Sequence, residues 1–107
     1  QLCAWVAGGE LAQRLASGGP SLAAGFVNRK ADPFMVTVHP KPEDEEIFLN
    51  SHSGQEFNMV VSGRMLIRIN GKDLILSEGD SIYFNSELPH GMKALDGEKV
   101  SFLAVIL

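Results

Sequence analysis

The stretch Asn50-Ser-His-Ser-Gly-Gln-Glu-Phe-Asn-Met-Val-Val-Ser-Gly63 decides the fold that this sequence predicts. Successive side chains of a strand point to opposite faces of the sheet, so residues of one parity share a face. One parity here is polar and can bind a metal, and the other is apolar. The polar row is Asn50, His52, Glu56 and Asn58, continued by Val60, and the apolar row is Phe57, Met59 and Val61. Such a strand needs a covering layer behind it and a pocket in front.

A second stretch supplies another histidine: Gly79-Asp-Ser-Ile-Tyr-Phe-Asn-Ser-Glu-Leu-Pro-His90. Gly79-Asp80 predicts a tight turn into a strand over residues 82–84, and Pro89 fixes the backbone just before His90. In a small barrel, side chains from different strands meet in the interior. We therefore expect His90 to converge with His52 and Glu56.

The composition is that of one folded domain with many turns. The chain has 107 residues, of which 45% are hydrophobic, 11 are glycine and 5 are proline. This favours a single all-β domain. We expect residues 1–20 to be a linker or N-terminal extension and residues 21–107 to be the barrel. The chain begins at Gln1 without a methionine, so we also expect further chain upstream.

Charge and cysteine content exclude several classes of protein. The net charge is -4 and no basic cluster exceeds Arg29-Lys30, so direct binding to nucleic acid is not expected. A single cysteine, Cys3, allows no intrachain disulfide and favours a reducing, cytoplasmic location. The longest apolar run, residues 102–107, is far shorter than the roughly 20 residues of a membrane span. No signal peptide is recognisable.

The remaining sequence predicts short strands separated by turns. Asn70-Gly71 is the dipeptide that a type I′ hairpin requires, and Asp96-Gly97 predicts another hairpin. The run over residues 100–107 is apolar on both parities, which is typical of a strand buried on both faces. With the β-capable segments 21–28, 34–38, 64–69 and 73–76, about eight or nine strands are expected, closed into a double-sheet jelly roll.

The three converging side chains suit a divalent transition metal. Two imidazoles and a carboxylate, from His52, His90 and Glu56, are ligands for Fe(II), Mn(II), Ni(II) or Zn(II), and they leave coordination positions open. A polar network satisfied internally or by water is the alternative. Glu56 could act as a general base, but Ser53 and Ser62 lack a histidine at hydrolase spacing. We assign no catalytic residue, and a binding domain is favoured over an enzyme.

The spacing of these motifs resembles that of the cupin superfamily. The residues are His-x3-Glu-x6-Gly (His52, Glu56, Gly63), then Gly79-Asp80, then Pro89-His90. The resemblance implies a double-stranded β-helix and a metal triad of His52, Glu56 and His90. Cupins usually carry a further histidine two residues before the retained one, where this chain has Asn50. This departure leaves two readings open: a weaker three-ligand metal site, or a pocket that binds an organic ligand by hydrogen bonds.

A narrower resemblance concerns the phrases at residues 32–38, 49–58, 79–84 and 89–95. They look like the C-terminal cupin domain of bacterial transcription regulators that carry a helix-turn-helix of the xenobiotic-response-element type. This implies a homodimeric small-molecule sensor whose DNA contacts are made elsewhere. The rival reading is a stand-alone metal-dependent cupin enzyme, a dioxygenase or isomerase, and an inert barrel is a third. The expected ligand contacts are Asn50, His52, Glu56, Asn58 and His90, with Tyr83 closing one side.

Overall fold

The computed structural model describes residues 21–107, and the predicted linker at residues 1–20 lies outside them. The described part of the chain is all-β. Its strands are β1 (Asp32–Val38), β2 (Gln55–Ser62), β3 (Met65–Ile69), β4 (Lys72–Leu76), β5 (Ser81–Asn85), β6 (His90–Ala94) and β7 (Val100–Ile106). Within residues 21–107, no helix has the length and hydropathy needed to span a bilayer.

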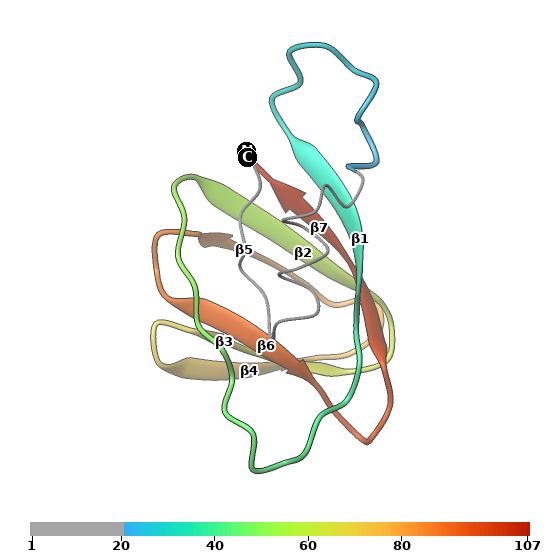
Figure 1. Ribbon diagram of the computed structural model, residues 1–107, viewed down its shortest axis with the longest axis vertical. Helices are drawn as coiled ribbons and strands as arrows, with labels where there is room; N and C mark the ends of the chain where they lie inside the picture. The colour runs from blue at the N-terminus through green and yellow to red at the C-terminus, as the bar shows by residue number, and fades with distance from the viewer. Residues whose placement is uncertain (1–20) are drawn as a thin grey trace.

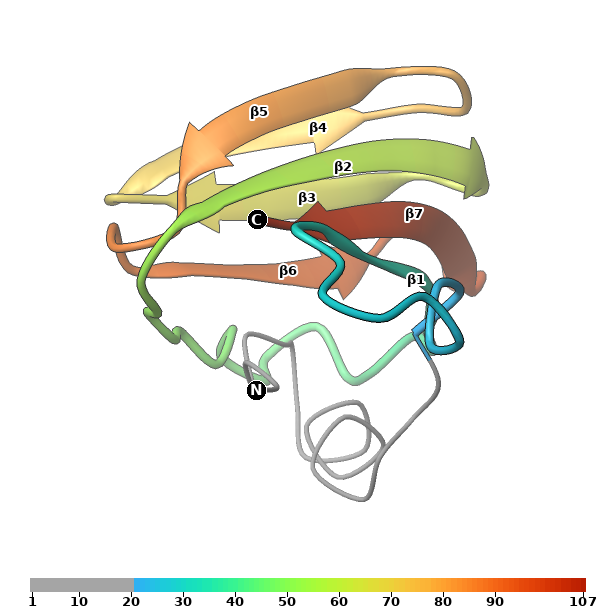
Figure 2. The same cartoon turned by 90° about the horizontal axis from the view of Figure 1, so that it is seen from above.

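The strands form two antiparallel sheets that face each other as a jelly roll (Figure 1). One sheet has four strands in the order β1-β7-β2-β5, and the other has three in the order β4-β3-β6. From β2 onward the chain changes sheet at every connection except the one between β3 and β4. The view from above shows how β2 and β7 curve around the interior (Figure 2). The predicted all-β double-sheet jelly roll is confirmed.

The core lies between the sheets and comes from alternate residues of each strand. Burying a large apolar side chain contributes about 1.5–3 kcal/mol relative to leaving it exposed. The inward residues of β1, β2, β3, β6 and β7 fill most of this space: Phe34, Val36, Val38, Val60, Met65, Ile67, Met92, Val100, Phe102 and Ala104. Alternation with a period of two thus holds along the strands, as the sequence predicts.

The two predicted hairpins have different outcomes. Asn70 and Gly71 have φ angles of 50° and 82° and join β3 to β4 in one sheet, so this hairpin is confirmed. Asp96 and Gly97 also have positive φ, at 60° and 67°. However, β6 pairs with β3, whereas β7 pairs with β1 and β2. The second turn therefore carries the chain from one sheet to the other, and the predicted hairpin is wrong.

Three other expectations need correction. Residues 21–28 form turns rather than a strand, with short-range hydrogen bonds from the Ala24 and Phe26 amides, so the described residues hold seven strands. β7 is buried on its inward face but only half-buried on the other, because its sheet has one covered side. The strand expected from Asn50 begins at Gln55, because the backbone bends at Ser53-Gly54.

The apolar row opposite Glu56 lies on the outer face of the four-stranded sheet, as its parity predicts. Phe57 and Met59 are half-buried there, and Val61 is exposed. A second subunit covering this face stays a prediction.

Candidate metal centre

Glu56 lies on the inward face of β2, the strand that runs between β7 and β5. Its backbone is paired with Ile106 on one side and Phe84 on the other. The side chain is fully buried. A carboxylate in this position is held rigidly, because its strand is hydrogen-bonded along both edges.

His52 reaches the same interior from a loop rather than from the strand. The backbone bends at Ser53-Gly54, where Gly54 has a φ of 102°, and the His52 amide donates to the Ser86 carbonyl at 2.9 Å. A Cβ at Gly54 would overlap the carbonyl of Leu107, so glycine is required sterically as well. With this bend, the His52 imidazole faces the same side of the sheet as the Glu56 carboxylate.

His90 is the first residue of β6, in the opposite sheet. Its backbone forms an isolated bridge with Asn50, with N–O distances of 2.9 Å in both directions. Its Nδ1 lies 2.7 Å from the Leu88 carbonyl, which can only accept, so Nδ1 carries the proton. The tautomer of His90 is thereby fixed with the electron pair on Nε2, which is the nitrogen that faces Glu56 and the form of imidazole that binds metals. The ring of Phe84 packs edge-on against it at 5.0 Å.

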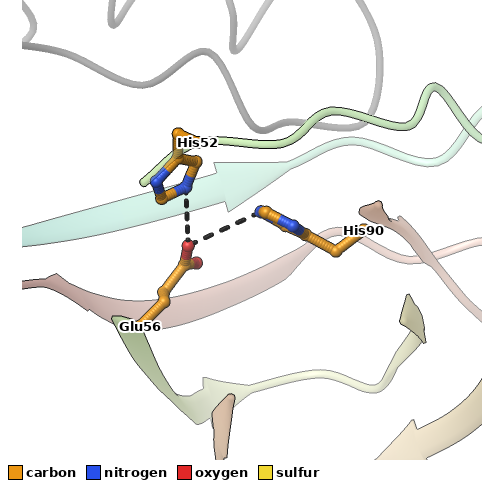
Figure 3. Close-up of side chains that lie close together, drawn as sticks. All are labelled: His52, Glu56 and His90. Atoms are coloured by element: carbon orange, nitrogen blue, oxygen red, sulfur yellow. Dashed lines mark hydrogen bonds and ion pairs between the residues drawn. The ribbon is translucent and has the colours of Figure 1, made fainter. Parts of the chain in front are cut away.

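The three side chains converge in the interior (Figure 3). Glu56 Oε1 lies 3.2 Å from His52 Nε2 and 3.7 Å from His90 Nε2. The two imidazole rings meet edge-to-face with their centroids 5.2 Å apart. One ligand atom from each residue falls within 4.8 Å of the others. Metal–ligand bonds of about 2.0–2.2 Å place neighbouring ligands about 3–3.5 Å apart, so small side-chain adjustments suffice to hold an ion here.

Burial controls the protonation of the site. Removal from water raises the pKa of Glu56 to about 7, although hydrogen bonds from His52 and Asn58 and the charge of His52 act in the opposite direction. Burial also lowers the pKa of His90, against the hydrogen bond to Leu88. Burial therefore disfavours the charged forms of both Glu56 and His90, and the Glu56 carboxyl changes its protonation state near neutral pH.

Asn58 supports the carboxylate from behind. It is fully buried two residues along β2, and its amide nitrogen, in the orientation that satisfies both ends of the amide, donates to Glu56 Oε2 at 3.0 Å and to the Phe57 carbonyl at 3.1 Å. This leaves Oε1 directed at the histidines. We expected Asn58 to contact the ligand directly, and the structure shows its side chain bound to the carboxylate of Glu56.

The other two expected contact residues differ in their position: the backbone of Asn50 pairs with that of His90, whereas Tyr83 lies on the outer face of its sheet. Asn50 is half-buried, and its side-chain oxygen accepts from the Ser51 amide at 2.8 Å. Tyr83 points to the outer face of its sheet, where it is 56% exposed and donates to Gln55. The expectation that Tyr83 closes the pocket is wrong, because neighbouring residues of a strand face opposite ways and Phe84 takes the inward position.

Two inward-facing residues near the triad were not singled out from the sequence. Phe84 packs against His90 and belongs to the core, and Ser86 follows β5 with the same inward parity. That parity was the available signal. A shallow hollow in the surface lies at the same end of β2 and β5, lined by Gly54, Gln55, Asn85, Glu87 and Leu107.

Comparison with known proteins agrees with the geometry. A family model described as the cupin domain matches residues 34–106. No curated protein matches the chain.

Several solved structures of one enzyme are similar. HppE with Fe(II) and substrate is 30% identical with a TM-score of 0.63, over 72% of this chain and 45% of that one. HppE with Co(II) and substrate is 29% identical with a TM-score of 0.62, over 72% and 44%. The hydroxypropylphosphonic acid epoxidase from S. wedmorenis in complex with fosfomycin is 28% identical with a TM-score of 0.62, over 72% and 43%. This chain spans less than half the length of each.

Proposed function

Since the chain belongs to the cupin family, we propose that it holds one divalent transition metal at His52, Glu56 and His90 and binds a small oxygen-bearing molecule beside it. The observation that carries this proposal is the convergence of three buried ligand atoms within 4.8 Å. Burying ionisable groups is unfavourable unless they are paired, and a bound cation would offset that penalty. Iron or cobalt is a reasonable occupant, since both metals are named in the HppE structures.

The residues around the triad are arranged for this task. Leu88 fixes the tautomer of His90, and Asn58 orients the Glu56 carboxylate. Bound at this site, the metal would supply Lewis acidity and coordination positions open to an external ligand. The aromatic ring of Phe84 borders His90 and limits the access of water to that side.

We favour a metal-dependent enzyme acting on a small polar molecule. Support comes from the likeness to HppE, whose solved structures include substrate complexes with Fe(II) and Co(II). Two imidazoles and one carboxylate are the ligand set of many non-haem iron oxygenases. We propose the same class of chemistry, metal-assisted oxidation, with the substrate left undefined.

The second candidate is the sensor domain of a helix-turn-helix transcription regulator. It is supported by the phrases at residues 32–38, 49–58, 79–84 and 89–95, and by a net charge of -4, which would leave DNA contacts to another part of the protein. In this reading the chain is a homodimer, joined through the outer face that bears Phe57 and Met59, and the ligand changes the geometry of the dimer.

The metal is tested with protein purified without a histidine tag and loaded with Fe(II) under anaerobic conditions. Elemental analysis should give one ion per chain in the wild type and none in His52→Ala. Wild-type protein that takes up no iron, cobalt, nickel, manganese or zinc would refute the proposal.

The full-length protein distinguishes the two functions. Consumption of dioxygen with a candidate substrate supports the enzyme. A helix-turn-helix in the same reading frame, with DNA affinity that changes when the ligand is added, supports the sensor.

A further inference from the structure

Ser86 carries a buried hydroxyl that the fold itself does not use. It follows the last residue of β5, its side chain is fully buried, and its Oγ has no hydrogen-bond partner in the part of the chain that the structure describes. Leaving a hydroxyl unpaired away from water is unfavourable, and most buried polar groups are satisfied. An unpaired buried hydroxyl in a folded protein therefore calls for a functional explanation.

The backbone of Ser86 shows where its side chain points. Its amide donates to the Gly54 carbonyl at 3.1 Å, and its carbonyl accepts from the His52 amide at 2.9 Å. These bonds continue the pairing of β2 with β5, in which Glu56 lies opposite Phe84. Ser86 therefore has the inward parity of Phe84, whose ring lies 5.0 Å from that of His90. The hydroxyl therefore lies on the face of the sheet that bears the triad. The backbone of Ser86 is hydrogen-bonded to that of His52.

Ser86 also lies next to a hollow in the surface. Its two sequence neighbours, Asn85 and Glu87, line the hollow at this end of the barrel together with Gly54. Both neighbours have outward parity, so Ser86 lies between the hollow and the interior.

We propose that Ser86 Oγ–H donates a hydrogen bond to the anion or oxygen ligand bound at the metal, so that Ser86 is a specificity-determining residue of the site. The inference rests on the proposed metal centre. It names the class of ligand as one that presents an oxyanion or another acceptor next to the metal. A buried hydroxyl offers a single donor, so a ligand without an acceptor near it would leave that donor unpaired and would be disfavoured.

The test uses cobalt-loaded protein and inorganic azide, a metal-binding anion that accepts hydrogen bonds, followed by the visible spectrum of Co(II). We expect Ser86→Ala to weaken azide binding about tenfold, the effect of one hydrogen bond to a charged group. Cobalt affinity should stay within about twofold of wild type, because Ser86 is not a ligand of the metal. Ser81→Ala, an exposed serine on the outward face of the same strand, is the matched control and should change neither value.

Thermal unfolding of the metal-free protein distinguishes a ligand-binding role of Ser86 from a purely structural one. Removing an unpartnered hydroxyl breaks no hydrogen bond, so Ser86→Ala should unfold at the same temperature as wild type or higher. A lower unfolding temperature would mean that the hydroxyl is an internal structural group and would overturn the proposal.

The remaining outcomes are also decisive. Equal azide affinity in Ser86→Ala and wild type, with cobalt bound in both, overturns the role of Ser86 and leaves the metal centre intact. Wild-type protein that binds no cobalt overturns the metal centre and the Ser86 inference with it. Cobalt bound without any response to azide contradicts an open ligand position, and so contradicts the inference.

Discussion

Glu56 Oε1 lies 3.7 Å from His90 Nε2, and this pair links β2 of the four-stranded sheet to β6 of the three-stranded sheet across the interior. Both side chains are fully buried. The hydrocarbon core packs the sheets together, whereas this polar pair brings ligating atoms from the two sheets face to face. A cation between them would convert an unfavourable burial of ionisable groups into a favourable one.

Loss of either histidine of the triad should abolish tight metal binding. His52→Ala and His90→Ala each remove one of three ligands, and we expect the affinity for Co(II) to fall by more than the roughly 10–100-fold typical of losing a supporting residue. Competition with a chromogenic chelator measures it. His39→Ala is the matched control, because His39 is exposed and outside the triad. Equal losses in all three variants would contradict the assignment.

Asn58 should control metal affinity without touching the metal. Asn58→Ala removes the donor to Glu56 Oε2, so we expect a roughly 10–100-fold loss of Co(II) affinity. The pKa of Glu56 should rise further, because the hydrogen bond from Asn58 lowers it in the wild type. Isothermal titration gives the affinity, and NMR of the carboxyl carbon gives the pKa. An unchanged pKa would show that Asn58 does not bind the carboxylate.

Metal affinity should depend on pH through Glu56. The ion binds the carboxylate, while in the metal-free protein burial raises the pKa of Glu56 to about 7. Below pH 7 a proton must leave Glu56 before the metal binds, so the dissociation constant should rise about tenfold for each unit by which the pH falls. Above pH 7 the contribution of Glu56 should level off. A dissociation constant that is flat between pH 5.5 and 7 would exclude this coupling.

The stability of the metal-free protein should show the opposite dependence. The folded pKa of Glu56 is raised above its unfolded value, so its contribution to stability is fully present below about 4.5 and is lost as pH rises through about 7. The full loss is about 3 kcal/mol as an upper limit. The lowered pKa of His90 acts against it, since that contribution is lost as pH falls.

Urea unfolding at pH 5 and pH 8 measures the difference. Glu56→Gln carries no titrating group at this position and should be less sensitive to pH than the wild type. The same loss of stability at pH 8 in both proteins would mean that other groups are responsible.

Gly91 should be needed to position the loop that precedes the site. A Cβ at Gly91 would overlap the carbonyl of Phe48 and lie 2.7 Å from a methyl of Ile47. Gly91→Ala should cost about 1–3 kcal/mol of stability and weaken metal binding, because residues 47–52 must shift and they carry His52. Gly25→Ala, with no atom within 4 Å of its Cβ, is the control for glycine replacement. Urea unfolding and chelator competition check both effects, and full stability in Gly91→Ala would contradict the close packing.

The site was predictable in its ligand set but not in its surroundings. His52, Glu56 and His90 follow from residue types and motif spacing, and the structure brings their ligand atoms together. The assignment of Tyr83 to the pocket failed because it ignored the parity that places Phe84 inward. The hairpin at Asp96-Gly97 failed because a turn dipeptide fixes φ locally and does not determine which strands pair on either side of it.

The sequence by itself determined the alternation along β2, the positive-φ turn at Asn70-Gly71 and the chemistry of the ligands, because these depend on each residue and its immediate neighbours in the chain. The tertiary structure decided the rest. It brought His52 inward through a bend, placed Asn58 behind Glu56 and buried the hydroxyl of Ser86. These features arise from pairing and burial between segments far apart in the sequence, and spacing within one segment cannot specify them.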